Sequence, residues 1–187
     1  MKSDIGVAQA DMRRAFVGGA TGVFASACVW IASALVSLAA TPRQAIAALL
    51  IGGMLIHPLA IVLAKLLGRS GTTTEGNPLA RLALEGTVWM LLTIPVAYAL
   101  SFQRTEWFFL AMLLTIAGRY LTFATLYGMR IYWACSAVLA AAACALAMTR
   151  ADSSVVTFAG GVIELIFAAI IFARRNAGEM HTNQSPG

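Results

Sequence analysis

Four ionisable side chains interrupt the apolar stretches of this sequence, and they are the residues most able to do chemistry. His57, Glu85, Arg119 and Glu164 stand in four different apolar runs, and Arg81 precedes Glu85 by four residues. An imidazole, two carboxylates and a guanidinium could bind a polar solute or an ion and exchange protons with it. One such charge in lipid costs about 2.5–3.5 kcal/mol, so four would cost on the order of 10 kcal/mol if exposed to it. The sequence therefore predicts that these side chains face inward.

The elements that must position these residues are membrane helices. Of 187 residues, 60% are hydrophobic and 11% are charged, whereas soluble domains carry about 25% charged residues. A helix crosses a bilayer with about 20 apolar residues, and six runs are long enough. We predict an all-α integral membrane protein, a bundle of six transmembrane helices within residues 15–175, with an N-terminal segment at 1–14 and a polar tail at 176–187. The six helices are expected at 15–39, 45–67, 79–100, 107–127, 131–148 and 155–173.

The basic residues predict the orientation of this bundle, because Lys and Arg collect on the cytoplasmic side. Nine of them fall at one end of the predicted helices and three at the other, so both termini are expected in the cytoplasm and the protein in the inner (plasma) membrane. The nine are Lys2, Arg13, Arg14, Lys65, Arg69, Arg81, Arg130, Arg174 and Arg175, and the three are Arg43, Arg104 and Arg150. The net charge of +5 is thus explained by topology, and nucleic acid is not expected as a partner.

In this orientation His57, Glu85, Arg119 and Glu164 fall at similar depths, and we call them the ionisable layer. Glu85 lies six residues into its helix, about 9 Å deep, and the other three fall between mid-membrane and the inner third. The expected pairs are Glu85 with Arg81 or Arg119, and Glu164 with His57 or Arg119. Such a layer is either a salt-bridge network that fixes the helices or a hydrated site for a solute.

Other chemistry has little support in the sequence. The three cysteines are odd in number, form no CxxC and lie in apolar runs, and there are only two histidines. No HExxH, GxSG or P-loop motif occurs. The sequence therefore predicts no metal site, no cofactor and no catalytic residue.

Small residues recur along the first predicted helix. Gly18, Gly22 and Ser26 follow one another at four-residue spacing, the pattern that lets membrane helices approach closely. This face is expected to pack inside the bundle or against a second copy in a homodimer.

Two functions from different classes fit these features. The first is a small transporter or channel-like protein for a polar or ionic solute, which would bind at the ionisable layer with Arg81 at its cytoplasmic mouth. The second is a non-catalytic assembly or sensor subunit in which the charges are structural and the small-residue face binds a partner. A lipid-modifying enzyme is the third hypothesis.

Overall fold

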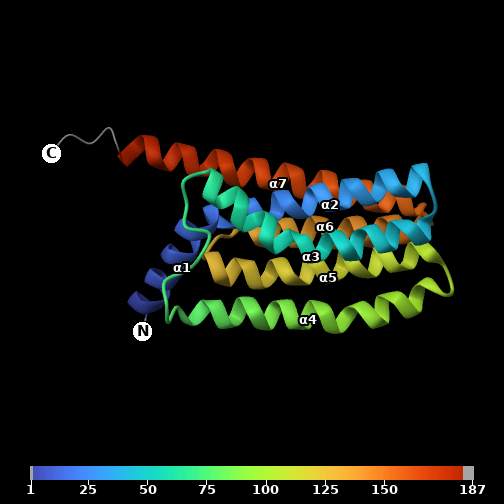
Figure 1. The fold of residues 1–187 in the computed structure, drawn as a ribbon, viewed down its shortest axis with the longest axis horizontal. Coiled ribbons are helices and arrows are strands. Elements are labelled where there is room, and N and C mark those ends of the chain that lie inside the picture. The colour runs from blue at the N-terminus through green and yellow to red at the C-terminus, as the bar shows by residue number, and fades with distance from the viewer. Residues whose placement is uncertain (1, 183–187) are drawn as a thin grey trace.

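The chain is built from helices alone throughout the part that the computed structural model describes, residues 2–182 (Figure 1). Six helical segments are long and apolar enough to cross a membrane. This confirms the prediction of an all-α, multi-pass membrane protein. The helices are α1 (Lys2–Phe16), a short 3-10 turn η1 (Val17–Gly19), α2 (Ala20–Ala39), α3 (Pro42–Leu66), α4 (Pro78–Ser101), α5 (Thr105–Tyr127), α6 (Ile131–Met148) and α7 (Ser153–Thr182).

Local sequence signals explain where α3 and α4 begin. The Asn77 side chain accepts a hydrogen bond from the Leu79 backbone N–H at 3.0 Å, and Pro78 occupies the first helical position. Thr41 caps α3 in the same way, accepting from Gln44 N–H at 3.3 Å, again with proline next. A capping oxygen satisfies one of the free N–H groups of the first turn, and proline has no N–H to leave unsatisfied.

The first predicted helix, 15–39, is broken in the structure. The residues of η1 separate α1 from α2, with φ +57° at Val17, +64° at Gly18 and +87° at Gly19. A left-handed backbone cannot continue an α-helix, and glycine adopts it at little cost. Gly18 is thus part of a bend rather than of a helical face. Residues 2–14 of the predicted N-terminal segment belong to α1, which lies across one end of the bundle (Figure 1).

The last helix also differs from its prediction, because α7 continues to Thr182 instead of ending near 173. This places the first part of the predicted tail 176–187 in a helix. Residues 183–187 lie outside the described part of the chain.

Glycines allow α2 to pack closely on two neighbours. A Cβ at Gly161 of α7 would lie 2.6 Å from an Ile31 side-chain carbon and 3.1 Å from the Ala27 carbonyl oxygen. A Cβ at Gly52 of α3 would lie 2.6 Å from Val29. Close approach through small residues is the usual basis of helix association in membranes. The contact between α2 and α7 is the most extensive between any two described helices.

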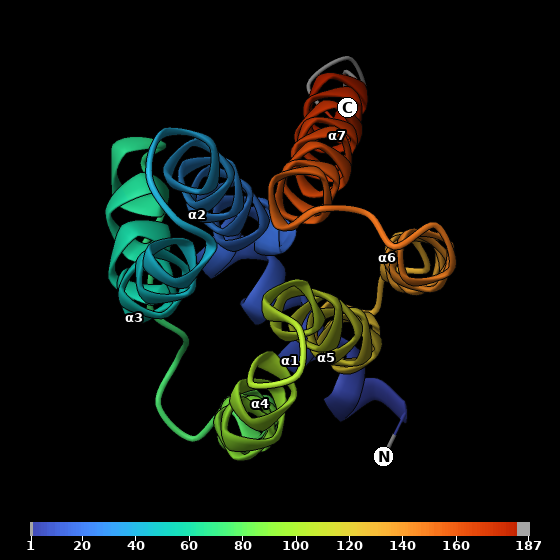
Figure 2. The same ribbon diagram turned by 90° about the vertical axis from the view of Figure 1, so that its right-hand side faces the viewer.

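α3 and α4 pack mainly on different helices of the described chain rather than on each other. α3 packs mainly on α2, whereas α4 packs mainly on α5, and the described helices show no extensive contact between α3 and α4. Viewed along the bundle, the loop after α3 crosses from one to the other (Figure 2). We call the end that carries this loop and α1 the basic end, because Arg13, Arg14, Lys65, Arg81, Arg130 and Arg174 belong to the helix ends that meet there.

The bend at Gly19 provides a stability prediction. A Cβ there would overlap the Tyr132 hydroxyl and lie 2.6 Å from a Tyr127 ring carbon, at a φ of +87°. Gly19→Ala should therefore lower the free energy of unfolding by about 2 kcal/mol or more, measured by thermal or denaturant unfolding in detergent. Gly118→Ala is the control, because nothing lies within 4 Å of a Cβ at Gly118. Equal stability of the two variants would contradict the bend.

Candidate functional site

A cavity of about 580 Å³ lies in the half of the bundle nearest the basic end. Its walls come from α2, α3, α4 and α5, and residues of α1 and of the loop after α3 cover its end. The volume is within the range of about 300–1,000 Å³ typical of small-molecule sites, which are also mainly apolar with few polar groups. Its polar lining includes Arg119, His57, Thr87, Ser26 and Tyr120.

Arg119 is the one lining residue with a permanent charge. It is partly buried on α5, and two of its nitrogens point to α4: one lies 3.2 Å from the Thr87 hydroxyl and the other 3.2 Å from the Met90 sulfur. Its guanidinium carbon also lies 5.5 Å from the Phe123 ring centroid. Among the side chains that the structure describes, no carboxylate pairs with Arg119. Thr87 and Met90 were not expected from the sequence, because residues of these types are common in apolar helices.

His57 lines the cavity at a position that is exposed at the surface of the bundle. It is exposed on α3, and Leu84 on α4, also a lining residue, is 63% exposed. The lining residues of α2 and α5 are more enclosed, with Thr21 and Leu126 almost fully buried. The cavity therefore opens between α3 and α4.

Glu164 is the fully buried member of the ionisable layer. It lies behind the cavity wall on α7, and its Oε1 accepts a hydrogen bond from the Tyr120 hydroxyl of α5 at 2.5 Å. Within the described residues its Oε2 has no hydrogen-bond partner, and Ser26 is close to the same carboxyl group. The pairs expected with His57 or Arg119 are not formed. The phenol of Tyr120 was missed because only charged partners were considered.

Glu85 and Arg81 lie outside the cavity. The Arg81 Nε is 3.1 Å from the Glu85 Oε1, so this expected pair is formed, but the two side chains are 86% and 59% exposed. Neither residue lines the cavity. The ionisable layer is therefore divided between the cavity (Arg119, His57), the packed interior behind its wall (Glu164) and an outer face of α4 (Glu85).

The three small residues expected to form one face have different neighbours. Gly18 lies in the bend, where a Cβ would meet the Met129 sulfur at 3.2 Å. Gly22 faces Ala60 of α3 and lines the cavity together with Ser26. These contacts are inside one chain, and the homodimer stays a prediction.

Four aromatic rings support the wall that contains Tyr120. Tyr132 stacks on Tyr120 and on Tyr127, with centroids 5.8 and 5.6 Å apart, and the Phe123 ring meets all three edge-on. The Tyr132 hydroxyl donates to the Gly18 carbonyl at 2.6 Å. The bend before α2 is thereby tied to the wall of the cavity.

Hydrogen bonds hold α1 over the end of the cavity. Asp11 accepts from the backbone N–H and hydroxyl of Thr74, at 3.0 and 2.8 Å, and from the Asn77 amide at 2.8 Å. The Arg13 guanidinium donates to the Tyr127 carbonyl at 2.6 Å. The inner face of α1 buries Met12, which lines the cavity. The helix is thus fixed to the start of α4 and to the end of α5.

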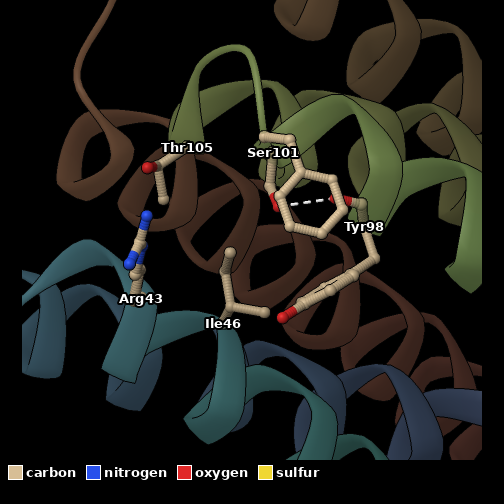
Figure 3. A pocket seen from close by; sticks show the side chains of 6 residues that line it. Arg43, Ile46, Tyr98, Ser101 and Thr105 are labelled. Atoms are coloured by element: carbon tan, nitrogen blue, oxygen red, sulfur yellow. Dashed lines mark hydrogen bonds between the residues drawn. The ribbon is translucent and has the colours of Figure 1, made fainter.

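A smaller pocket, about 170 Å³, lies between α3, α4 and the start of α5 at the opposite end of the bundle (Figure 3). Arg43 of α3 points toward Thr105 at the start of α5. On α4, the Ser101 hydroxyl donates to the Tyr98 carbonyl at 2.6 Å. Each of the two pockets thus contains one arginine.

The groups of the larger cavity are suited to binding rather than to covalent chemistry. No three His, Cys, Asp or Glu residues are clustered for metal binding in the described part of the chain. The cavity combines a guanidinium, hydroxyls and apolar surface. Such a set can hold an anion by charge-assisted hydrogen bonds.

Fold and cavity together define a multi-pass helical membrane protein with a cationic cavity between its helices. A family model matches residues 5–174, and the chain belongs to this family of unknown function (DUF7010). No curated protein matches the chain, and no solved structure does.

The contact between Glu164 and Tyr120 leads to a second prediction. Glu164→Gln keeps an acceptor for the phenol and should change the free energy of unfolding by less than about 1 kcal/mol, whereas Glu164→Met, of similar volume, leaves the phenol unpaired and should cost about 1–3 kcal/mol. Both are measured by unfolding in detergent. If Gln were as harmful as Met, the position would need the carboxyl group itself and not only an acceptor for the phenol.

Proposed function

We propose that this protein is a small membrane transporter that binds an anionic solute in the cavity at Arg119. The observation that carries the proposal is an arginine at membrane depth, in a cavity, without a carboxylate partner among the described residues. Arg119 lies eight residues before the end of α5, about 12 Å from it. Charged residues at such depth usually belong to a functional site.

The charge of the lining supports an anion rather than a cation. None of the residues that line the cavity is acidic. Thr87 accepts from Arg119 and donates to the Ala83 carbonyl at 3.0 Å, so the guanidinium has only weak partners to exchange for an anion. Glu85 and Arg81 have no part in this form of the proposal, because their pair lies on the outside.

The arrangement of α3, α4 and α5 supports transport rather than binding alone. These helices line both pockets, one near each end of the bundle. On each of these helices, a buried residue lies in the sequence between the residues that line the two pockets. These residues are Leu49 of α3, Ala97 of α4 and Leu113 of α5, and all three belong to one apolar cluster. A protein that alternates access needs such a closed section on one side of its site.

The same observations disfavour the assembly-subunit hypothesis. That hypothesis requires a dry network in which every intramembrane charge is paired, because an unpaired charge would destabilise the bundle and serve no other purpose. Arg119 lacks such a pair in the described structure, and the residues meant for partner binding, Gly22 and Ser26, line the cavity instead.

The orientation and the membrane are part of the proposal. We place the basic end, with both termini, in the cytoplasm and the protein in the inner (plasma) membrane, because basic residues are retained on that side. A homodimer is included because the chain is small for a carrier that alternates access.

The first test measures anion binding and uptake. Arg119→Gln should weaken binding of the transported anion about tenfold or more, since hydrogen bonds to charged groups contribute about 1.5–3 kcal/mol, and should abolish uptake into proteoliposomes. Arg119→Lys should keep part of both. The matched control is Arg81→Gln, which removes an arginine of the outer face. Loss of function in the control alone would contradict the assignment of the site.

The second test concerns orientation. Reporter domains fused after the C-terminus and in the loop between α2 and α3 should report opposite sides, with the C-terminal fusion active only as a cytoplasmic reporter. Neutralising Arg13 and Arg14 together should lower the fraction of molecules in this orientation. A C-terminal fusion active only outside the cytoplasm would reverse the proposed topology.

A further inference from the structure

The cavity opens where a bilayer would supply its ligand. Leu84 lies six residues into α4, about 9 Å from the start of the helix, and His57 lies nine residues from the end of α3, about 14 Å. Both side chains line the cavity and both are exposed. A hydrocarbon core about 30 Å thick would surround these positions. A molecule entering between α3 and α4 would therefore come from among the lipid chains.

The route from the basic end is more restricted. α1 and the loop after α3 cover that end, where Met12 is buried and the Gly71 N–H donates to the Ala15 carbonyl at 3.2 Å. Asp11 holds the same loop through Thr74. A water-soluble ion would need this cover to move, whereas an amphiphile in the bilayer would not.

The lining of the cavity has the polarity that an amphiphile would require. Most lining residues are apolar, among them Ile56, Ile61, Leu84, Ile116 and Phe123. Arg119 provides the cation on the wall formed by α5. A ligand that satisfies both features has one anionic group and an apolar body.

We propose that the cavity takes a single-chain amphiphilic anion from the bilayer, with its oxyanion on Arg119 and its hydrocarbon chain in the opening between α3 and α4. This rests on the proposed function and specifies its substrate class. A carboxylate and a phosphate monoester share the required chemistry. A guanidinium binds either group with two parallel hydrogen bonds.

Gly53 allows the cavity to be filled without disturbing the fold. It lines the cavity on α3, and a Cβ built there has nothing within 4 Å. Gly53→Leu should therefore occupy the space of the hydrocarbon chain. Gly118→Leu is the matched control, because Gly118 is an exposed helical glycine with equally open surroundings that does not line the cavity.

The experiment measures equilibrium binding to purified protein in a neutral detergent, with radiolabelled myristate, dodecyl phosphate, myristyl alcohol and acetate as probes. We expect saturable binding of myristate and dodecyl phosphate, at least tenfold weaker in Arg119→Gln, partly restored in Arg119→Lys and lost in Gly53→Leu. Gly118→Leu should bind as the parent does. Thermal unfolding of each variant shows that it is folded.

The remaining outcomes separate this inference from the proposed function. If acetate bound in an Arg119-dependent way and neither myristate nor dodecyl phosphate bound, the amphiphilic ligand would be ruled out, while the proposed anion transporter would stand. Equal binding of myristyl alcohol and myristate, unaffected by Arg119→Gln, would overturn both. Absence of binding by all four probes would also overturn both. Unchanged myristate binding in a folded Gly53→Leu variant would overturn the location of the chain.

Discussion

A bilayer interior offers no hydrogen-bond partners, so every polar group that the chain carries into it must find one within the bundle. The structure meets this constraint with few contacts: Glu164 accepts from Tyr120, Arg119 donates to Thr87, Tyr132 donates to the Gly18 carbonyl and Ser33 donates to the Ala45 carbonyl at 2.8 Å. Each contact joins two segments, so satisfying the polar groups also fixes how the helices are rotated. Two groups depart from this rule among the described residues: the buried Glu164 Oε2 has no hydrogen-bond partner, and Arg119 has only weak partners. Only at Arg119 does the structure leave room for a ligand.

The site follows from uneven packing around this framework. α2, α5 and α7 contribute the most enclosed surfaces, whereas α3 and α4 are held on one side only. Space is left where those two helices would otherwise meet, and Arg119 and His57 lie beside that space. The least tightly packed part of the bundle is thus also the part where Arg119 has no carboxylate partner among the described residues. A rigid core with loosely held helices beside a cavity is the arrangement expected when binding depends on motion.

Much of the fold could be predicted from the sequence, because an apolar run of about 20 residues specifies a spanning helix by itself. The residues Asn77 and Pro78 are also of the types that begin helices, and α4 begins at Pro78. The bend at Gly18-Gly19 was missed because the same glycines also fit a straight packing face. The partners of the charges were mostly missed as well. Which side chains meet depends on how each helix is rotated about its axis and on which helices pack against it. A helix that is apolar on all sides gives no sequence pattern from which either can be predicted. Only the Arg81–Glu85 pair, set by spacing on one helix, followed directly from the sequence.

The close contact between α2 and α7 has a consequence for how the molecule is made. Among the spanning helices of the described residues, α2 leaves the ribosome first and α7 last. Trp30 and Ala27 of α2 meet the glycines of α7, so this face of α2 lacks these partners until α7 has been made. Glu164 arrives with the same last segment, after Tyr120 is already in place. The contact between α2 and α7 therefore forms late in the synthesis of the bundle, and a chain stopped before α7 would leave the α2 face at Ala27 and Trp30 and the Tyr120 phenol without these partners.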